Sequence, residues 1–434
     1  MRKGCGGLLQ SQLPNKWWGF FLGSLFFVSQ SPVQAAVSFL AAMDLAVETD
    51  PFAIVMADFN SDTNLDLAVT NRASNTVSIL LGTGTGSFST VTSLPVGISP
   101  RSIVAADFDG DTDLDLAVGN RDSTSPDPNT ISILLNDGTG SFGLQTTFET
   151  GTSGNNQPFS IVTGDFNRDN RLDLAVANRD SDSIAILLGT GIGSFGAPTL
   201  ITAGSRPFSL AVADFNADGN LDLAVANRNS DNVSILLGTG TGSFGTGGNF
   251  AVGIQPHAIV TADFNRDNRL DLAVANRDSE DVSVLLGTGT GSFGAAKSFP
   301  ASAGTQPFAL TVTDIDGDGH LDLAVANRDT DTFSIYRGDS TGNFATPVDF
   351  LIGNDPAAIA AGDLNRDGKP DLVIANALDN DISILLNAST PPPAPAPDTP
   401  IATIPVLSPL GLAALAAVLA GLGLRRTCKQ NNHG

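Results

Sequence analysis

One acidic phrase recurs seven times along this chain of 434 residues, and this repeat constrains the fold more than any other feature. Successive opening aspartates are 49, 58, 49, 49, 51 and 49 residues apart. They are Asp58, Asp107, Asp165, Asp214, Asp263, Asp314 and Asp363. A period of about 50 residues indicates a repeat architecture, in which each unit packs on its neighbours. Residues 36–388 are therefore expected to form one repeated body rather than several unrelated domains.

Each repeat is expected to contain four short strands. In the third repeat they are residues 158–166, 172–178, 183–189 and 197–204, and residues 172–178 (LDLAVAN) alternate with period two. No window within the repeats has helical periodicity. Four antiparallel strands per unit, repeated radially, make the blade of a β-propeller, and seven units fall within the usual range of blades. The predicted fold class is all-β, a seven-bladed β-propeller of four-stranded antiparallel blades.

The two ends of the array predict how the ring closes. The seventh repeat stops near residue 390, before its fourth strand, whereas residues 38–52 precede the first repeat and match the fourth-strand region of the third repeat. The N-terminal strand is therefore expected to complete the last blade. Closure of this kind removes the free sheet edges that an open array would expose.

The acidic phrase predicts a metal loop. Across the seven copies, positions 1, 5 and 9 are Asp, position 3 is Asp or Asn, and position 6 is Gly or Asn in five copies, residues that tolerate a left-handed turn. Position 7 varies and includes cationic side chains, so its expected contribution is the backbone carbonyl. An all-oxygen shell of this size suits Ca²⁺, whereas Mg²⁺ keeps more water. The candidate metal ligands, loop by loop, are Asp58, Asn60, Asp62, Asn64, Asp66; Asp107, Asp109, Asp111, Asp113, Asp115; Asp165, Asn167, Asp169, Arg171, Asp173; Asp214, Asn216, Asp218, Asn220, Asp222; Asp263, Asn265, Asp267, Arg269, Asp271; Asp314, Asp316, Asp318, His320, Asp322; and Asp363, Asn365, Asp367, Lys369, Asp371.

An EF-hand and a metal-free turn are the two alternatives to this metal loop. An EF-hand needs a Glu at position 12 and flanking helices, but position 12 here is Val or Ile within an expected strand. Turns stabilised by Asp and Asn side chains alone would need no metal. Clustered carboxylates repel one another strongly without a cation, which favours the metal.

The pattern resembles the calcium loops of FG-GAP/VCBS repeats, the units of integrin-α-type seven-bladed propellers. The resemblance covers about four-fifths of the chain. It implies up to seven Ca²⁺ ions, each in the loop that joins the first and second strands of a blade. It also implies that ligands contact the opposite face.

The Gly-rich phrase GTGTGSF, at Gly82, Gly238 and Gly287, lacks the Lys and the helix of a phosphate-binding loop. A hairpin turn between the third and fourth strands is the expected structure.

Two features fall on the face opposite the calcium loops. Arginine follows the second strand in six repeats, at Arg72, Arg121, Arg179, Arg228, Arg277 and Arg328, with Ala377 in the seventh. These side chains could ring an anionic ligand, or they could pair with the adjacent Asp122, Asp180, Asp278 and Asp329 or with the neighbouring blade. The second repeat also carries insertions within residues 123–130 and 151–157, either a ligand contact or neutral loop drift.

The two ends of the chain predict export. Residues 1–35 resemble a secretory signal peptide cleaved near Ala35, with an uncleaved membrane anchor as the alternative. Residues 389–403 predict an extended, proline-rich linker. Residues 404–434 contain the apolar run 410–424 and then Arg425 and Arg426. They resemble the IPTL-type C-terminal sorting signal of Gram-negative bacteria, which implies an exosortase-type processing protease as partner; a plain membrane anchor is the alternative.

Composition narrows the function. The net charge of −23 argues against a nucleic-acid partner. Three His and two Cys, the latter at Cys5 and Cys428, leave little material for zinc, disulfide or thiol chemistry within the repeats. No catalytic residue and no organic-cofactor site is expected. The predicted function is a cell-surface or extracellular binding and adhesion module for a glycan or protein. A polysaccharide-degrading or phosphohydrolase enzyme, or a structural matrix component, are the alternatives.

Overall fold

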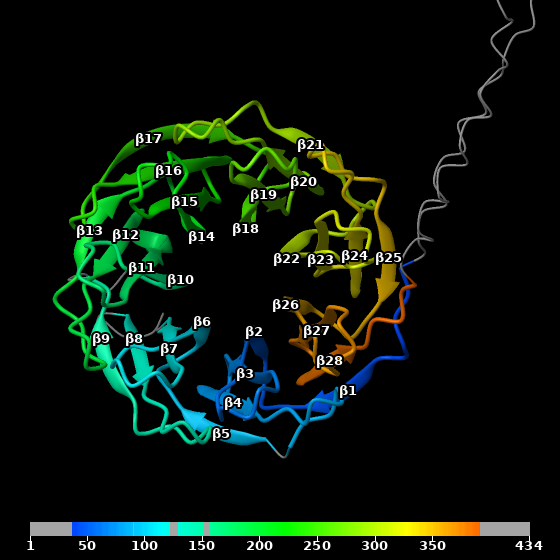
Figure 1. The fold of residues 1–434 in the computed structure, drawn as a ribbon, viewed down its shortest axis with the longest axis horizontal. Coiled ribbons are helices and arrows are strands. Elements are labelled where there is room, and N and C mark those ends of the chain that lie inside the picture. Colours follow the sequence, from blue (N-terminus) through cyan, green and yellow to red (C-terminus); the bar gives the residue numbers. More distant parts are fainter. Residues whose placement is uncertain (1–36, 90, 122–128, 152–155, 391–434) are drawn as a thin grey trace, which may run out of the picture. The chain divides into compact units, whose positions relative to one another are not determined.

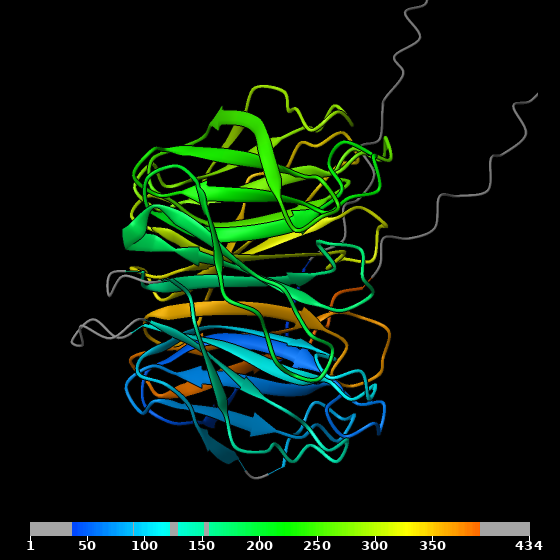
Figure 2. The same cartoon turned by 90° about the vertical axis from the view of Figure 1, so that its left-hand side faces the viewer.

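Seven four-stranded antiparallel sheets stand around a central axis (Figure 1). The computed structural model describes residues 37–89, 91–121, 129–151 and 156–390. Within each blade the chain runs outward, from an innermost strand beside the axis to an outermost strand at the rim. The interstrand loops gather at the two ends of this axis, left and right in Figure 2. The predicted all-β, seven-bladed propeller is therefore confirmed.

The innermost strands are β2 (Pro51–Ala57), β6 (Pro100–Ala106), β10 (Pro158–Gly164), β14 (Pro207–Ala213), β18 (Pro256–Ala262), β22 (Pro307–Thr313) and β26 (Pro356–Gly362). The second strands are β3 (Asp66–Asn71), β7 (Asp115–Asn120), β11 (Asp173–Asn178), β15 (Asp222–Asn227), β19 (Asp271–Asn276), β23 (Asp322–Asn327) and β27 (Asp371–Asn376). The third strands are β4 (Thr76–Leu80), β8 (Thr130–Leu134), β12 (Ser183–Leu187), β16 (Asn232–Gly238), β20 (Asp281–Leu285), β24 (Thr332–Tyr336) and β28 (Asp381–Leu385). The outermost strands are β5 (Thr92–Pro95), β9 (Thr146–Glu149), β13 (Thr199–Thr202), β17 (Phe244–Ala251), β21 (Lys297–Pro300), β25 (Val348–Leu351) and, for the last blade, β1 (Met43–Ala46). A 3₁₀ turn, η1 (Arg179–Ser181), follows β11.

The N-terminal strand closes the ring as predicted. Strand β1 pairs antiparallel with β28, from Met43 opposite Ile384 to Ala46 opposite Asp381. Phe39 extends the contact and meets Phe333 and Phe350 edge-on, with ring centroids 5.5 and 5.4 Å away. The last blade thus combines the two ends of the repeat array.

The second strand of every blade is buried on both faces, because each blade is packed between two others. In β11, Leu174 and Val176 pack in a cluster with the preceding blade. Ala175 and Ala177, on the other face, pack in a cluster that includes Leu223 of the following blade. The period-two alternation therefore separates large from small side chains rather than buried from exposed ones. Small residues on one face leave room for the bulky residues of the neighbour, which gives close packing.

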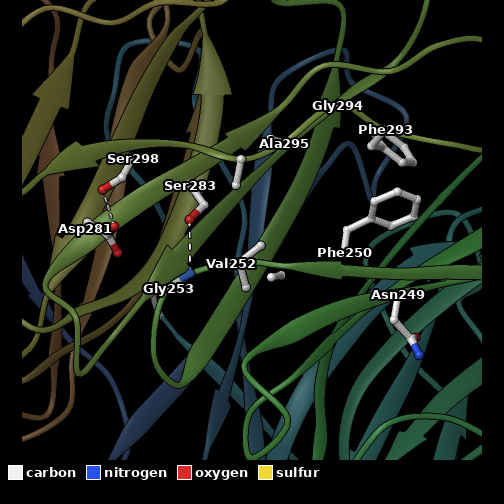
Figure 3. A pocket seen from close by; sticks show the side chains of 12 residues that line it. Asn249, Phe250, Val252, Gly253, Asp281, Ser283, Phe293, Gly294, Ala295 and Ser298 are labelled. Carbon is white, nitrogen blue, oxygen red and sulfur yellow. Dashed lines mark hydrogen bonds between the residues drawn. The ribbon is translucent and has the colours of Figure 1, made fainter.

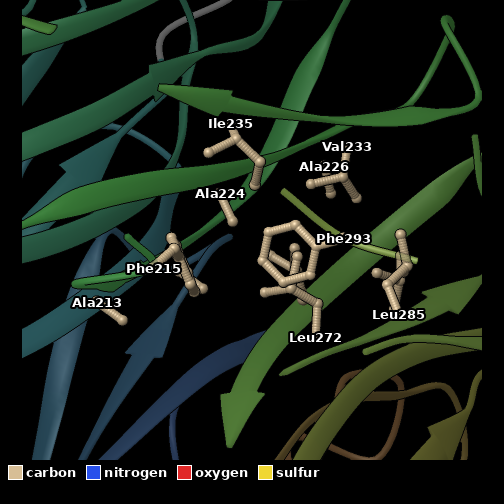
Figure 4. Packing of buried hydrophobic residues seen from close by; sticks show 12 residues of the cluster. Ala213, Phe215, Ala224, Ala226, Val233, Ile235, Leu272, Leu285 and Phe293 are labelled. Atoms are coloured by element: carbon tan, nitrogen blue, oxygen red, sulfur yellow. The ribbon is translucent and has the colours of Figure 1, made fainter. Parts of the chain in front are cut away.

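Figure 4 shows one of these inter-blade cores, between the fourth and fifth blades. Phe215 lies in the loop after β14, the innermost strand of the fourth blade. Its ring meets that of Phe293 of the fifth blade edge-to-face, with the ring centroids 5.6 Å apart. Leu272 and Leu285 of the fifth blade complete the cluster against Ile235 of the fourth. Each blade is thus stabilised by its neighbours rather than by a core of its own.

The predictions for residues 1–35, 391–403 and 404–434 fall outside the described residues and stay predictions. Within the part of the chain that is described, no helix has the length and apolar character that a membrane span requires.

Candidate functional site

All seven acidic phrases form the loop between the innermost and the second strand of a blade. Position 1 directly follows the innermost strand, as Asp58 follows β2, and position 9 opens the second strand, as Asp66 opens β3. Position 2 is a buried apolar anchor, such as Phe59. Position 6 has a positive φ in every loop, as predicted for the five that have Gly or Asn there and also in the two that have Thr; these residues are Thr63, Thr112, Asn170, Gly219, Asn268, Gly319 and Gly368.

Hydrogen bonds to the backbone hold the acidic side chains of each loop inward. In the first loop, the N–H of Asp62 donates to Asp58 Oδ1 and to Asn60 Oδ1, each at 3.1 Å. The N–H of Thr63 donates to Asp58 Oδ2 at 2.7 Å. The N–H of Asn64 donates to Asp62 Oδ1 at 2.8 Å. The other loops repeat most of this pattern, so the oxygens at positions 1, 3 and 5 are oriented by the chain itself.

The donor set fits a hard divalent cation best in the two loops that have Asp at position 3. One carboxylate oxygen from each of Asp314, Asp316 and Asp318 lies within 4.8 Å of the others, and Asp107, Asp109 and Asp115 converge in the same way. Asp316 is buried, and its Oδ2 accepts no hydrogen bond within the described residues. An oxygen-only set of this kind suits Ca²⁺. Such an ion would offset the repulsion among the carboxylates; the remaining five loops have Asn at position 3 and carry one charge fewer.

Position 9 differs from the other candidate ligands because both of its oxygens are already engaged. Asp66 Oδ2 accepts the N–H of Phe59 at 2.8 Å, and its Oδ1 accepts the N–H of Gly82 at 2.7 Å. All seven position-9 aspartates are fully buried and make the same pair of bonds. This residue therefore ties the acidic loop to the hairpin after the third strand.

Burial raises the pKa of the position-9 carboxyl. The two N–H donors lower this pKa, but their effect is smaller than that of burial. The pKa reaches about 6 for Asp115, Asp173 and Asp271 and about 7 for Asp322. Further oxygen ligation by this residue would need the remaining lone pairs of the same two oxygens.

Two of the cationic side chains at position 7 are exposed to solvent. The side chains of Arg171 and Arg269 are 53% and 54% exposed. The guanidinium group of Arg171 lies 3.9 Å from the carboxylate at position 5 of its own loop, and that of Arg269 lies 3.8 Å from the corresponding carboxylate. This arrangement leaves the backbone carbonyl as the group that position 7 could offer to a cation.

Every acidic loop except the sixth also packs on the hairpin after the third strand of the next blade. In the last blade Asn387 takes the place of the hairpin and donates to the carbonyl of Ile315 at 2.8 Å. Phe59 meets Phe142 edge-on at 5.6 Å, and Phe166 meets Phe244 at 5.5 Å. The N–H of Gly242 donates to the carbonyl of Phe166 at 2.9 Å. The glycine-rich phrase is thus a hairpin turn, as predicted, and it also links neighbouring blades.

The end of the central axis opposite the acidic loops carries a second cluster, which was not predicted from the sequence. The second residue of each innermost strand faces the axis, and Phe52, Phe159, Phe208 and Phe308 form one buried cluster there. Phe52 contacts Phe159 and Phe308 edge-on at 6.0 and 5.9 Å, so blades far apart in the sequence meet across the axis. We call these four rings the phenylalanine plug. The signal was present: the residue after each strand-opening proline is Phe52, Arg101, Phe159, Phe208, His257, Phe308 or Ala357.

FG-GAP-like repeats match residues 40–118, 119–176, 165–225, 214–274, 265–325 and 314–374. The chain belongs to the FG-GAP repeat family. No curated protein matches it.

Solved structures resemble this FG-GAP propeller in fold. A virginiamycin B lyase from Staphylococcus aureus is 14% identical over 80% of this chain and 99% of its own, with a TM-score of 0.57. The periplasmic gluconolactonase PpgL of Pseudomonas aeruginosa is 16% identical over 72% and 88%, with a TM-score of 0.56. A structure of BBS1N in complex with ARL6DN is 16% identical over 80% and 96%, with a TM-score of 0.56. At these identities the likeness establishes the fold alone.

Five arginines of the predicted series in this FG-GAP propeller have three kinds of partner. Arg179 pairs with the adjacent Asp180 at 2.6 Å, whereas Arg72 pairs with Asp50 and Arg328 with Asp355, residues that precede innermost strands. Arg121 and Arg228 instead donate to glutamine side chains that precede the next innermost strand. Only one arginine therefore uses an adjacent aspartate among the described residues, and Asp122 lies outside them.

The insertions of the second repeat lie mostly in the ranges 122–128 and 152–155, outside the described residues, so their function stays a prediction. Their ends approach each other: the N–H of Thr150 donates to the carbonyl of Asn129 at 3.1 Å.

A groove on the outer wall, between the fourth and fifth blades, has a volume of about 500 Å³ (Figure 3). Its polar side chains are engaged within the protein. The hydroxyl of Ser298 donates to Asp281, and the N–H of Gly253 donates to Ser283 Oγ at 3.2 Å. We therefore place the candidate functional sites at the two ends of the axis.

Proposed function

We propose that this FG-GAP propeller is an extracellular binding module that takes up Ca²⁺ in the acidic loops and binds a glycan or protein at the opposite face. The observation that carries the proposal is the division between the two ends of the axis. One end carries preoriented carboxylates in seven loops, and the other gathers arginine and aromatic side chains around a plugged channel. Ca²⁺ would add rigidity to the ring, and the opposite face would be left for recognition.

The residues that would hold Ca²⁺ are the side chains at positions 1, 3 and 5 and the position-7 carbonyl, with position 9 as an additional donor. Calcium supplies no reaction in this proposal; it neutralises clustered carboxylates and fixes the loop. Calorimetric titration of the full chain with CaCl₂ tests the proposal, with Asp314→Asn, Asp316→Asn as the variant. Lys297→Gln, in the outermost strand β21 and outside the acidic loops, is the control. Equal heats for the parent chain and the double variant would contradict a site in the sixth loop.

A ligand screen on glycans and proteins tests the recognition part of the proposal. We expect a ligand whose binding is unaffected by substitutions in the acidic loops when Ca²⁺ is saturating. A structural matrix component would bind no separate ligand.

An enzyme is the second candidate, because solved structures of similar fold include proteins named as a lyase and a gluconolactonase. Turnover of a lactone or polysaccharide by the full chain would favour this alternative, whereas binding without turnover would favour the binding module.

The location that we infer is the cell surface or the extracellular space of a Gram-negative bacterium. It rests on the signal peptide and the IPTL-type signal expected from the sequence, with an exosortase-type protease as processing partner and membrane contact through residues 404–434 only. Cell fractionation and the mass of the mature chain would test it.

A further inference from the structure

The end of the axis opposite the acidic loops gathers arginine side chains. Eight arginines surround it, seven of them flanking the innermost and second strands and one within the start of β6. We call this set the arginine rim: Arg72, Arg101, Arg121, Arg179, Arg206, Arg228, Arg277 and Arg328. The guanidinium groups of Arg72, Arg228 and Arg328 lie 4.8–5.7 Å from the ring centres of the phenylalanine plug. Aspartates lie in the same loops, and Asp50, Asp180 and Asp355 pair with three of these arginines.

Five members of the arginine rim have no carboxylate within 4.0 Å in the described part of the chain. They are Arg101, Arg121, Arg206, Arg228 and Arg277. The Nε atoms of Arg101 and Arg277 are buried and have no hydrogen-bond partner there. A buried donor that has no hydrogen-bond partner makes the folded protein less stable than one that has a partner. These two guanidinium groups therefore have unused capacity to bind an acceptor.

Arg101 occupies the position that holds a phenylalanine in four other blades. Its guanidinium lies 5.0 Å from the ring centre of Phe52 and 5.1 Å from that of Phe159, so the cation sits among the rings of the plug. Burial, then the charges of Arg121 and Arg72, lower the pKa of Arg101 to about 9. A bound anion would relieve both the desolvation and the repulsion.

His257 supplies an independent sign of a ligand. Its side chain is only 4% exposed, stacks on Phe208 at 4.3 Å, and has no hydrogen-bond partner at either ring nitrogen. Buried polar groups in folded proteins are almost always hydrogen-bonded. Arg101, His257 and the four phenylalanines line one cavity of about 210 Å³ on the axis. The unused Nε donor of Arg101 and the unpartnered imidazole of His257 thus belong to the lining of the same small space.

We propose that this cavity, at the mouth of the ring opposite the acidic loops, binds the carboxylate group of an acidic sugar, a uronic acid. The proposal rests on the ligand-binding face of the proposed function and names its ligand class. Guanidinium groups match a carboxylate in a bidentate geometry, and the phenylalanine faces suit the apolar face of a sugar ring. The volume equals roughly seven water molecules, which selects one compact group rather than a peptide segment.

The test compares galacturonic acid with galactose, which share the ring and differ in the carboxylate. Calorimetric titration of the Ca²⁺-loaded full chain should detect the acid and not the neutral sugar. Arg101→Gln should weaken binding of the acid at least about tenfold, the low end for a hydrogen bond to a charged group, and His257→Phe, which removes the other polar side chain named above from the cavity, should also weaken it. Lys297→Gln, which removes an equal charge at the outer wall, should leave the affinity unchanged. His257→Phe keeps the test valid if Arg101→Gln lowers the melting temperature.

Equal binding of both sugars, or affinity for the acid that neither Arg101→Gln nor His257→Phe changes, would overturn the proposal. Acetate that binds as tightly as galacturonic acid would refute a sugar site, and a poly-glutamate peptide that binds in place of the sugar would assign the mouth to a protein. In each case a glycan or protein found by the ligand screen on this face would leave the proposed function standing. A propeller that binds no ligand in that screen would count against the proposed function itself.

Discussion

At the scale of single residues, the aspartate at position 9 has a structural role that the other acidic residues lack. Asp173 accepts two buried backbone N–H groups, from Phe166 and Gly189, whereas Asp169 is an exposed loop residue. The sequence phrase treats both as equivalent ligands, because spacing alone does not show which carboxylate also receives donors from a distant hairpin.

Asp173→Ala should therefore destabilise the protein even without calcium. Two orphaned donors at about 1–3 kcal/mol each predict a loss of about 2–6 kcal/mol in the free energy of unfolding. Asp169→Ala, the control, should change it by about 0.5 kcal/mol or less. Urea unfolding in the presence of a chelator measures both, and equal effects of the two variants would refute the distinction.

His257 makes a second residue-scale prediction, on pH. Burial, then the charges of Arg228 and Arg277, lower its pKa from 6.5 to about 2. The unfolded chain therefore binds a proton below pH 6.5 that the folded chain does not, so the stability present above that pH is lost as the pH falls.

His257→Phe should reduce this acid sensitivity, because phenylalanine occupies the equivalent position in four other blades. Between pH 6.5 and 5 the parent chain should lose about 2 kcal/mol more than the variant, at about 1.4 kcal/mol per pH unit. Unfolding curves of both proteins at several pH values isolate this residue from the carboxylates that titrate in the same range. Parallel pH profiles would show that His257 does not contribute.

At the scale of elements, the closing strand β1 contributes more than its short length suggests. Phe39 and Leu45 pack into the cores beside the last blade, and the strand covers the free edge of β28. A chain that begins at Glu48 should lose about 3–6 kcal/mol, the burial of two large apolar side chains.

Leu45→Ala should reproduce part of this loss of stability. Leu40→Ala, at a side chain that is 57% exposed, should not. An unchanged melting temperature of the shortened chain would mean that the strand does not stabilise the ring.

The elements also show what could be predicted from the sequence. The strands, the blade number and the closing strand follow from local patterns and from the transposed strand, so they were accessible. For the phenylalanine plug the sequence holds only the recurrence of Phe at one position of the repeat. The contact itself follows from the closed ring, because Phe52, Phe159 and Phe308 are far apart in the chain and meet across its axis. The same reason hid the bond between each position-9 aspartate and its hairpin.

At the scale of the whole molecule, the acidic loops and the blade interfaces form one connected ring. Every loop packs on the next blade, on its hairpin in all cases but the sixth, and in one of these contacts Gly242 donates to the carbonyl of Phe166. A cation that ordered one loop would therefore also order the neighbouring interface.

Calcium should raise the stability of the entire propeller. Sites of the extracellular type bind with a Kd of roughly 10⁻⁴–10⁻³ M. At about 1 mM Ca²⁺ each such site adds roughly 0.4–1.4 kcal/mol by mass action. Seven independent sites would add about 3–10 kcal/mol, comparable to the stability of a typical domain, about 5–15 kcal/mol. The chain should melt at a markedly lower temperature with a chelator than with millimolar Ca²⁺, and Mg²⁺ should raise the melting temperature less.

The double variant Asp165→Ala, Asp169→Ala removes two side-chain donors of the third loop and spares the structural Asp173. If the sites act independently, the stabilisation by Ca²⁺ should fall by one share, about 0.4–1.4 kcal/mol, and the stability in chelator should change little. A much larger fall would show that the blades respond together, through contacts such as that of Phe166 with Phe244. Melting temperatures of the parent chain that are equal with and without Ca²⁺ would exclude the calcium proposal, because sites of this affinity cannot be filled at the folded state without stabilising it.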